Sequence, residues 1–231
     1  FATGHYARVE YCKDTKRYLI RQAKDLKKDQ SYWLAFLSQK QLSKVVFPLG
    51  DYVKGEVREK ALALGLDTHD KPDSQDFFSG DYTQLINVPP RPGPITDREG
   101  TVLGTHKGIW SYTIGQRKGL GISAEKPLYV VDINEKENTV IVGSREDLAH
   151  SGLIAHDVNL IGVEDITHPM QVTMKIRYAQ KAFEGQVFPL QAGTARVQFK
   201  VPQRAVTPGQ AVVFYDGEYV LGGGIIERGE D

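Results

Sequence analysis

Apolar and polar residues alternate along much of the second half of the chain, which is the pattern of half-buried β-strands. Val172, Met174 and Ile176 alternate with polar residues and place one apolar side on an extended segment. The segment 127–143 alternates on both sides of a polar stretch, Asn134–Asn138. This arrangement predicts a hairpin whose turn is the polar stretch.

The last part of the chain continues the same pattern. We predict three strands in the segment 195–227, separated by a turn at Thr207–Gly209 and by a hairpin turn at Asp216–Gly217. Short strands at this spacing indicate a small closed or nearly closed β-barrel.

The first half opens with a hairpin and continues with helical patterns. The segment 5–23 alternates and carries turn residues at Lys13–Thr15, so it predicts a hairpin. We predict a helix over 29–46, with Asp29 as its N-cap. Its apolar face is expected to contain Trp33, Phe36, Leu37 and Leu42.

A second helix is predicted over 54–66. Val57, Ala61 and Leu64 share one face, and Gly65 is a candidate for the C-terminal cap. The first 70 residues therefore resemble the closing part of an α/β domain that lacks its own sheet. The segment 87–100 is rich in proline and glycine and predicts a linker or an ordered loop.

Composition narrows the class of protein. The chain has 231 residues, is 40% hydrophobic and has no net charge, so it carries no overall basic footprint. Its single cysteine, Cys12, excludes a disulfide within these residues and a site of several thiolates. No apolar run approaches the ~18 residues that span a membrane, and the six histidines show no i, i+4 pair. A reducing, cytoplasmic setting is the default expectation.

Charge is unevenly distributed. Phe1–Lys71 holds 14 basic against 9 acidic residues, with the densest basic run between Arg8 and Lys28. This run is either a solvated hairpin surface or a contact surface for a polyanion. The dense end of the run, Lys27 and Lys28, comes just before the predicted N-cap Asp29, an arrangement that suits a phosphate. The alternative is an ordinary capped helix.

The segment Gly104–Ile122 combines glycines, basic residues and two large aromatics. Arg117 and Lys118 are candidate phosphate donors, and Trp110 and Tyr112 are able to stack a base. The alternative is a glycine-rich connection whose aromatics belong to the core. The spacing matches neither a P-loop nor a dinucleotide fingerprint.

Arg177 and Tyr178, at the end of an alternating strand, form an Arg–aromatic pair of the kind that contacts RNA. The alternative is a solvated arginine on a barrel face. No Ser-His-Asp signature and no nucleophile elbow are present. Cys12 lies on the charged hairpin and is interpreted as an incidental thiol.

Several motifs, taken in chain order, resemble the tRNA-specific 2-thiouridylase family (MnmA/TrmU). They include ATGHYARV, KDQSYWL, KPDSQD, YTIGQRKGLGI, PGQAVVFY and LGGGII, and they extend over essentially the whole chain. The resemblance implies a mixed α/β and β protein with the C-terminal part of a PP-loop (adenine nucleotide alpha hydrolase-like) domain at 1–78. It also implies a small, mostly β central domain at 79–150 and a tRNA-binding β-barrel at 151–231. The pyrophosphate loop of the family would lie upstream of Phe1, so we expect these residues alone to be inactive.

The resemblance implies an ATP-dependent sulfurtransferase of the cytoplasm that uses Mg²⁺. The family adenylates the C2 oxygen of the wobble uridine, in tRNAs for lysine, glutamate and glutamine, and a protein persulfide then delivers sulfur to form 2-thiouridine. Matched motifs make Gly4 an ATP contact. They make the following residues tRNA contacts: His5, Lys28, Asp29, Gln30, Arg177, Tyr178 and Gln210. No metal ligands are assigned.

One position departs from the family pattern. Members carry a cysteine of persulfide transfer where this chain has Phe78, which cannot hold a persulfide. No catalytic residue is therefore assigned in these residues. The alternatives are upstream cysteines, with an iron–sulfur cluster or external sulfide, or a non-catalytic tRNA-binding paralogue. A tRNA methyltransferase is a third alternative, but no glycine-rich methyl-donor motif follows a strand.

Overall fold

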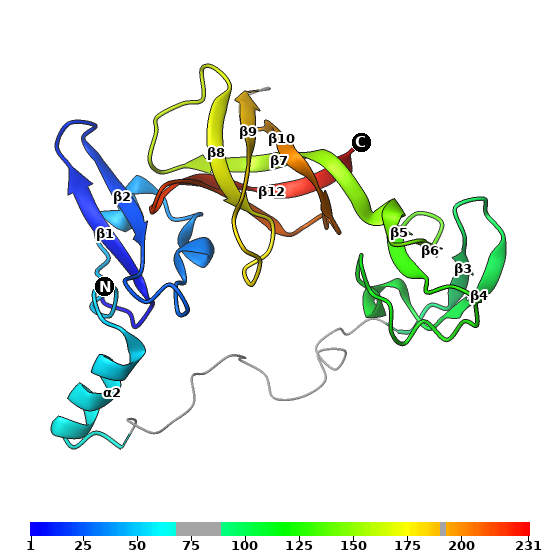
Figure 1. Cartoon of the computed structure of the whole chain (residues 1–231), viewed down its shortest axis with the longest axis horizontal. Helices are drawn as coiled ribbons and strands as arrows, with labels where there is room; N and C mark the ends of the chain where they lie inside the picture. Colours follow the sequence, from blue (N-terminus) through cyan, green and yellow to red (C-terminus); the bar gives the residue numbers. More distant parts are fainter. Residues whose placement is uncertain (68–88, 190–192) are drawn as a thin grey trace. The chain divides into compact units, whose positions relative to one another are not determined.

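The computed structural model describes residues 1–67, 89–189 and 193–231, which divide into two compact units. The first unit contains Phe1–Asp73, Gly152–Val201 and Pro208–Glu230, and the second contains mainly Ser74–Ser151. The first unit holds an N-terminal hairpin, short helices and a β-barrel (Figure 1). The second holds a four-stranded sheet. The expected succession of a partial α/β region, a mostly β region and a β-barrel is confirmed.

The barrel consists of six strands in the order β12-β11-β8-β9-β10-β7, and β7 pairs back with β12 to close it. In chain order these strands are β7 (Ala149–Leu160), β8 (Met170–Lys175), β9 (Phe183–Pro189), β10 (Ala195–Arg204), β11 (Ala211–Asp216) and β12 (Tyr219–Glu230). The predicted alternation is confirmed, because Val172, Met174 and Ile176 are buried while their neighbours are not. The three strands predicted after residue 195 and both of their turns are also present.

Three consecutive glycines allow β12 to pair on both sides. A Cβ at Gly222 would lie 2.3 Å from the carbonyl oxygen of Asn159 on β7, and one at Gly223 would lie 2.7 Å from that of Val212 on β11. Both neighbours are backbone atoms of adjacent strands, so a side chain would force the strands apart. The glycines thus explain how one strand closes the barrel.

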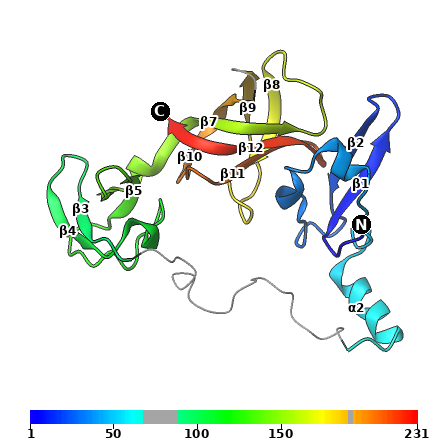
Figure 2. The same cartoon turned by 180° about the vertical axis from the view of Figure 1, so that it is seen from behind.

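The N-terminal hairpin is continuous with the barrel sheet. β1 (Ala7–Cys12) pairs with β2 (Arg17–Gln22) as predicted, and β2 in turn pairs with β12 through Arg21 and Ile20. The hairpin and the barrel lie side by side in both views (Figures 1 and 2). A shared core, which includes Ile20, Leu42 and Tyr215, joins them. The first segment therefore does not pack as an independent domain.

The helix predicted over 29–46 is wrong. The segment forms one turn of 3₁₀ helix, η1 (Ser31–Leu34), and one short helix, α1 (Gln39–Leu42). Ser38 caps α1 by accepting a hydrogen bond from the N–H of Gln41, so a separate helix starts there. Trp33 and Phe36, expected on a buried face, are 59% and 38% exposed.

The second predicted helix is confirmed as α2 (Lys54–Ala63). It ends where expected, because Gly65 adopts the left-handed conformation with φ of 67°. No residue of α2 is buried, and Leu64 is 74% exposed. Val57 and Ala61 are half-buried, so the expected common face is only partly covered by described residues.

A close contact between Gly50 and β1 gives a stability prediction. A Cβ at Gly50 would lie 1.9 Å from the carbonyl oxygen of Ala7, a backbone atom. We expect Gly50→Ala to lower the free energy of unfolding by about 1–3 kcal/mol, the range for overpacked sites, in urea denaturation. Gly55→Ala is the control, because a Cβ there meets nothing within 4 Å. An equal loss in both variants would contradict the prediction.

The second unit is built on a sheet with the order β4-β3-β6-β5. Its strands are β3 (Gly93–Thr96), β4 (Val102–His106), β5 (Tyr129–Asn134) and β6 (Thr139–Gly143), with 3₁₀ turns η3 (Ile109–Ser111) and η4 (Glu146–Leu148). The predicted hairpin of β5 and β6 is confirmed. The segment 87–100, predicted as a linker or loop, contains β3, which pairs with β4 and runs parallel to β6. The prolines in this segment argued against a strand. The pairing that stabilises β3 comes from β4 and β6, which its local sequence does not reveal.

Candidate nucleic-acid interface

Two segments assigned to tRNA binding meet in the first unit. The backbone N–H of Gln30 donates to the carbonyl oxygen of Tyr6 at 2.8 Å. The side-chain oxygen Oε1 of Gln30 accepts from the N–H of Tyr6 at 2.9 Å. This pair of bonds fixes the segment Lys28–Gln30 beside His5, which directly precedes Tyr6.

Asp29 shapes this site from inside. Its side chain is buried, with the residue 4% exposed. Oδ1 accepts from the N–H groups of Ala23 and Ser31 at 3.0 and 3.3 Å, and Oδ2 accepts from the Ser31 hydroxyl at 2.8 Å. The predicted N-cap at Asp29 is wrong, because the N-cap of η1 is Gln30, which makes no side-chain cap hydrogen bond. A carboxylate engaged in this way positions its neighbours, and its oxygens do not face solvent.

Three aromatic rings form a cluster beside Asp29. The ring of Tyr178 lies 5.3 Å from that of Trp33 and 6.1 Å from that of Tyr32, measured between centroids. Tyr32 and Trp33 meet edge to face at 5.2 Å. Such spacings are those of interacting aromatic pairs. Tyr178 is half-buried and packs against the core, so Trp33 is the outermost ring.

The rings lie among charged side chains. Burial raises the pKa of Tyr32 to about 12, and the positive charge of Arg177 partly opposes this rise. Burial also raises the pKa of Tyr178, with the charge of Asp29 acting in the same direction and that of Lys28 opposing it. Both hydroxyls therefore stay protonated at neutral pH. Lys28 and Arg177, distant in the sequence, act on the same ring cluster.

The Tyr32 hydroxyl links the cluster to the barrel. It donates to the carbonyl oxygen of Ala211, 179 residues further along the chain, at 2.9 Å. Ala211 follows Gln210, which is exposed and whose carbonyl oxygen accepts from the N–H of Ile226 at 2.8 Å. Gln210 is thus one residue away from a direct contact of the cluster, with its side chain on the surface.

His5 and Gly4 lie at the start of the chain. His5 is half-buried, with Nδ1 2.9 Å from the hydroxyl of Thr3 and its ring edge-to-face with Phe47 at 6.4 Å. Gly4 is exposed, and a Cβ there would meet only Leu49, at an ordinary 3.7 Å. Space for a ligand therefore exists against the backbone of Gly4.

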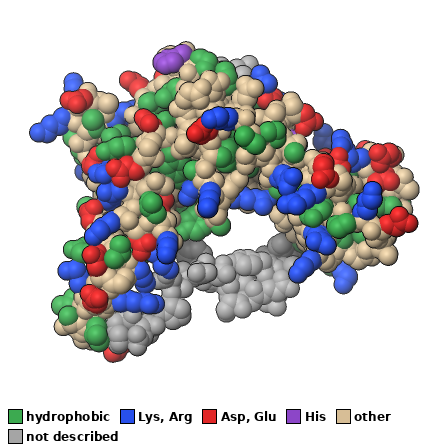
Figure 3. Space-filling model, in the orientation of Figure 1, with side chains coloured by type: hydrophobic (Ala, Val, Ile, Leu, Met, Phe, Trp, Pro, Cys, Tyr) green, Lys and Arg blue, Asp and Glu red, His purple; other side chains and the backbone are tan. Residues whose placement is uncertain are grey.

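The dense basic run between Arg8 and Lys28 is largely engaged within the protein. Arg8 and Arg21 both form ion pairs with Glu218, the first at 2.6 Å. Arg17 donates to carbonyl oxygens of the segment Leu160–Ile161 at 2.7 and 2.9 Å. On the face shown in Figure 3, basic side chains are interspersed with acidic ones. The arginines of the run therefore have structural partners. A polyanion contact stays a prediction for its lysines, of which Lys13, Lys16 and Lys27 are exposed.

The structure offers no helix start before Asp29 that could hold a phosphate, which was one of the two alternatives there. η1 has four residues, too few for a dipole, and the N–H of Ser31 is used by Asp29. The N–H of Gln30 is used by Tyr6. Any anion contact at Lys28 would therefore use its ammonium group.

The glycines of the segment Gly104–Ile122 have structural explanations. Gly115, Gly119 and Gly121 have φ of 89°, 77° and 69°, which side chains rarely adopt. Tyr112 also has a partner inside the unit, because its ring meets that of the buried His106 at 5.8 Å. His106 in turn donates from Nε2 to the carbonyl oxygen of Asn138 at 2.9 Å. For Tyr112, the core interpretation is the one the structure supports.

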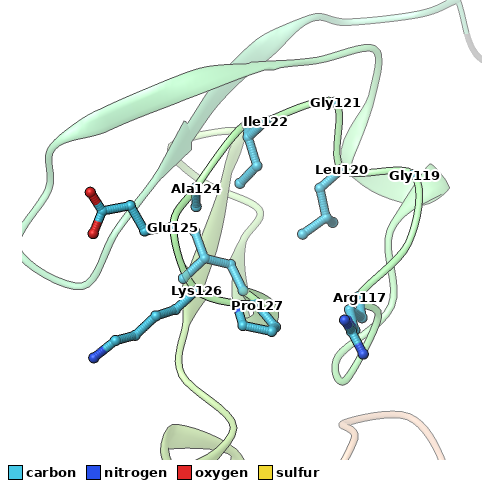
Figure 4. Close-up of a pocket in the computed structure, with 10 residues that line it drawn as sticks. Arg117, Gly119, Leu120, Gly121, Ile122, Ala124, Glu125, Lys126 and Pro127 are labelled. Carbon is cyan, nitrogen blue, oxygen red and sulfur yellow. The ribbon is translucent and has the colours of Figure 1, made fainter.

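Arg117 and Lys118 lie in the second unit, and both are exposed. Arg117 borders a shallow cavity of about 370 Å³. Leu120 and Ile122 point into this cavity, whereas Lys126 points away from it (Figure 4). Its lining mixes these aliphatic side chains with Arg117, Glu125 and glycine backbone, which does not specify a ligand. Contacts of Arg117 and Lys118 with RNA stay predictions.

Sequence reasoning missed the aromatic cluster. Trp33 was assigned to a buried helical face, and Tyr32 was not singled out. The available signal was the aromatic pair Tyr32–Trp33, which follows Lys28–Gln30 after one serine. It is the same combination of base-stacking and charged groups as Arg177–Tyr178. Phe78 lies outside the described residues.

In the described residues, no group of three His, Cys, Asp or Glu side chains lies close enough to hold a metal ion.

Cys12 is a half-buried free thiol whose pKa is lowered by hydrogen bonds with Thr15 and Asp14. Among the described helices, none is long and apolar enough to cross a bilayer.

Comparison with known families covers most of the chain. Residues 1–78 match the family model described as the tRNA methyl transferase HUP domain. Residues 85–144 match the tRNA methyl transferase PRC-barrel domain, and residues 150–226 match the aminomethyltransferase β-barrel domain.

Curated relatives match over nearly the full length of the chain. It is 50% identical to tRNA-specific 2-thiouridylase MnmA 1 of Caldanaerobacter subterraneus subsp. tengcongensis over 234 residues, which cover 98% of this chain and 64% of the relative. It is 46% identical to the tRNA-specific 2-thiouridylases MnmA of Endomicrobium trichonymphae and Acetivibrio thermocellus, covering 98% of this chain and 63% and 65% of theirs. The chain thus spans somewhat less than two thirds of these relatives. On these matches, the chain belongs to the tRNA-specific 2-thiouridylase family.

Proposed function

We propose that this chain provides the tRNA-binding part of an ATP-dependent tRNA sulfurtransferase that makes 2-thiouridine at the wobble position. The observation that carries the proposal is the meeting of Lys28–Gln30 with Arg177–Tyr178 on one aromatic cluster. A surface with cations beside an accessible ring suits single-stranded RNA, whose phosphates and bases need different partners. Relatives named as tRNA-specific 2-thiouridylases support the choice of tRNA.

Each residue has a distinct role in this proposal. Lys28 and Arg177 contact phosphates through their charges, and Tyr178 supports the ring cluster. Asp29 positions Lys28 and Gln30 from inside, which refines its assignment as a tRNA contact. His5 and Gln210 add polar contacts at the two sides of the cluster, and Arg117 and Lys118 add contacts from the central domain.

The chemistry of the whole enzyme follows from the resemblance. ATP with Mg²⁺ would adenylate the C2 oxygen of the uridine, and a persulfide-bearing donor protein would supply sulfur. The structure offers Gly4, which leaves space for a ligand, but one exposed glycine does not make a nucleotide site. No reaction step is therefore assigned to the described residues. An iron–sulfur cluster is one proposal for the full-length protein.

Phe78 motivates the second candidate function, a tRNA-binding protein without sulfur transfer. A phenylalanine stands where the resemblance places a persulfide cysteine. If the protein does transfer sulfur, as in the first candidate function, the transfer would depend on cysteines outside this chain. For both candidate functions we propose a cytoplasmic location and domain limits of 1–78, 79–150 and 151–231. We also propose that the bound tRNAs are those for lysine, glutamate and glutamine.

Two measurements separate these functions. The purified chain should bind unmodified tRNA with an affinity that falls as salt rises, because phosphate contacts release counterions. A flat salt response would contradict RNA binding through Lys28 and Arg177. Mass spectrometry of tRNA nucleosides should then show 2-thiouridine lost when the full-length gene is deleted and restored by its return. Binding without any change in 2-thiouridine would favour the non-catalytic protein.

A further inference from the structure

Trp33 combines high exposure with a fixed position. It is 59% exposed, whereas Tyr32, its neighbour in the same turn, is 2% exposed. Its ring is held by Tyr178 at 5.3 Å, with an interplanar angle of 37°, and by Tyr32 at 5.2 Å, edge to face. An exposed single aromatic is common in proteins. Trp33 differs in that two neighbouring rings contact its exposed indole and restrict its orientation.

The backbone beneath Trp33 is also fixed. Its N–H donates to the carbonyl oxygen of Gln30 at 3.1 Å. Gln30 is tied to Tyr6, and Ser31 is tied to Asp29 on the buried side of the turn. The indole therefore loses little conformational entropy when a flat ligand covers it, which favours binding.

The surroundings specify the ligand. Lys28 and Arg177 lie near the two tyrosines that brace Trp33. The charge of Arg177 lowers the pKa of Tyr32 and that of Lys28 lowers the pKa of Tyr178, in each case against the rise caused by burial. A flat ring with cations at its side matches a nucleotide, whose base stacks while its phosphate pairs with a cation. A protein partner would need a wider apolar patch, and the rings next to Trp33 are buried or half-buried.

We propose that the exposed indole of Trp33 is a stacking platform for an unpaired nucleobase of the bound RNA, an inference that rests on the proposed function. It assigns a base contact, whereas Lys28 and Arg177 contact phosphates. Base stacking is indifferent to salt, and phosphate pairing is not, so the two kinds of contact are separable.

The chain allows a direct optical test, because it has two tryptophans, Trp33 and Trp110. In the Trp110→Phe variant, fluorescence reports on Trp33 alone. We expect unmodified tRNA to quench this signal, and we expect heparin and a fully paired RNA duplex not to do so, since neither offers an unpaired base. Equal quenching by heparin would overturn the proposal, because it would show a response to charge.

Affinity measurements complete the test. Trp33→Ala should weaken tRNA binding about five- to 150-fold, the range for one stacked base, and leave the salt slope unchanged. Trp33→Tyr, which keeps a ring, should retain most of the affinity, and thermal melts check that each variant folds. If tRNA binds and quenching and affinity are both independent of Trp33, the stacking role is wrong while the proposed function stands.

Two further outcomes are informative. If the unmodified chain does not bind tRNA at low salt, the proposed function fails and the stacking role fails with it. If sedimentation shows a dimer that Trp33→Ala dissociates, Trp33 belongs to a contact between copies of the chain, and the stacking role is overturned.

Discussion

Replacement of Asp29 by alanine is expected to lower the free energy of unfolding by about 2–5 kcal/mol and to abolish most of the tRNA affinity. The substitution leaves the N–H groups of Ala23 and Ser31 and the Ser31 hydroxyl without their acceptor. Ala23 and Ser31 are 1% and 0% exposed, and each buried donor left unsatisfied costs roughly 1–3 kcal/mol. The turn that carries Lys28, Gln30 and Trp33 then loses its fixed position.

Urea denaturation measures the loss of stability, and hydrogen exchange locates it. Exchange of the Ala23 and Ser31 amides should accelerate in Asp29→Ala more than exchange within the four-stranded sheet of the second unit. Asp51→Ala is the matched control, since Asp51 is exposed and shows no contact of its carboxylate with another described residue. A surface change of this kind is expected to shift stability by less than about 0.5 kcal/mol. Unchanged amide exchange in Asp29→Ala would show that the buried carboxylate does not hold the turn.

Removal of the positive charge at Lys28 or Arg177 is expected to weaken tRNA binding by roughly ten- to 100-fold for each residue. A hydrogen bond to a charged group contributes about 1.5–3 kcal/mol, and about 1.4 kcal/mol corresponds to a factor of ten. The slope of log affinity against log salt should fall by about one for each lost phosphate contact. Titrations of Lys28→Ala and Arg177→Ala with tRNA at several salt concentrations measure both effects.

The control for this experiment is Lys200→Ala. Lys200 is an exposed lysine of the barrel that pairs with Glu184, so its removal changes the net charge equally without touching the ring cluster. Arg177→Lys keeps the charge at the site and should preserve the salt slope while losing the planar geometry of the guanidinium. If the two cluster variants behave like the Lys200 variant, binding depends on overall charge, and the proposed interface is wrong.

These experiments separate three contributions to one surface. Asp29 stabilises the turn from inside, Lys28 and Arg177 supply charge, and Trp33 supplies a flat face. Each contribution has its own observable: amide exchange, salt slope and indole fluorescence. Agreement among the three would establish an RNA-binding site within the described residues of this chain. None of the three measurements depends on the ATP site.

The strands and turns were predictable because their signals are local. Alternation in the segment 172–178, the turn at Asp216–Gly217 and the C-terminal glycine of α2 each reflect preferences of a few neighbouring residues. The helix over 29–46 failed although its spacing was helical. Ser38 competes for the backbone in the middle of that segment, and tertiary contacts bury Tyr32 and Leu42 while leaving Trp33 outside.

The sequence by itself therefore determined the strand pattern, the family resemblance and, through it, the residue types of the candidate site. The tertiary structure alone decided that Lys28–Gln30 lies beside Arg177–Tyr178, that Asp29 points inward and that Trp33 points outward. Spacing along a chain carries no information about which distant segments a closed barrel brings together. The burial of a given side chain depends on those distant segments, because the hydrogen bonds and apolar contacts that cover it come from them.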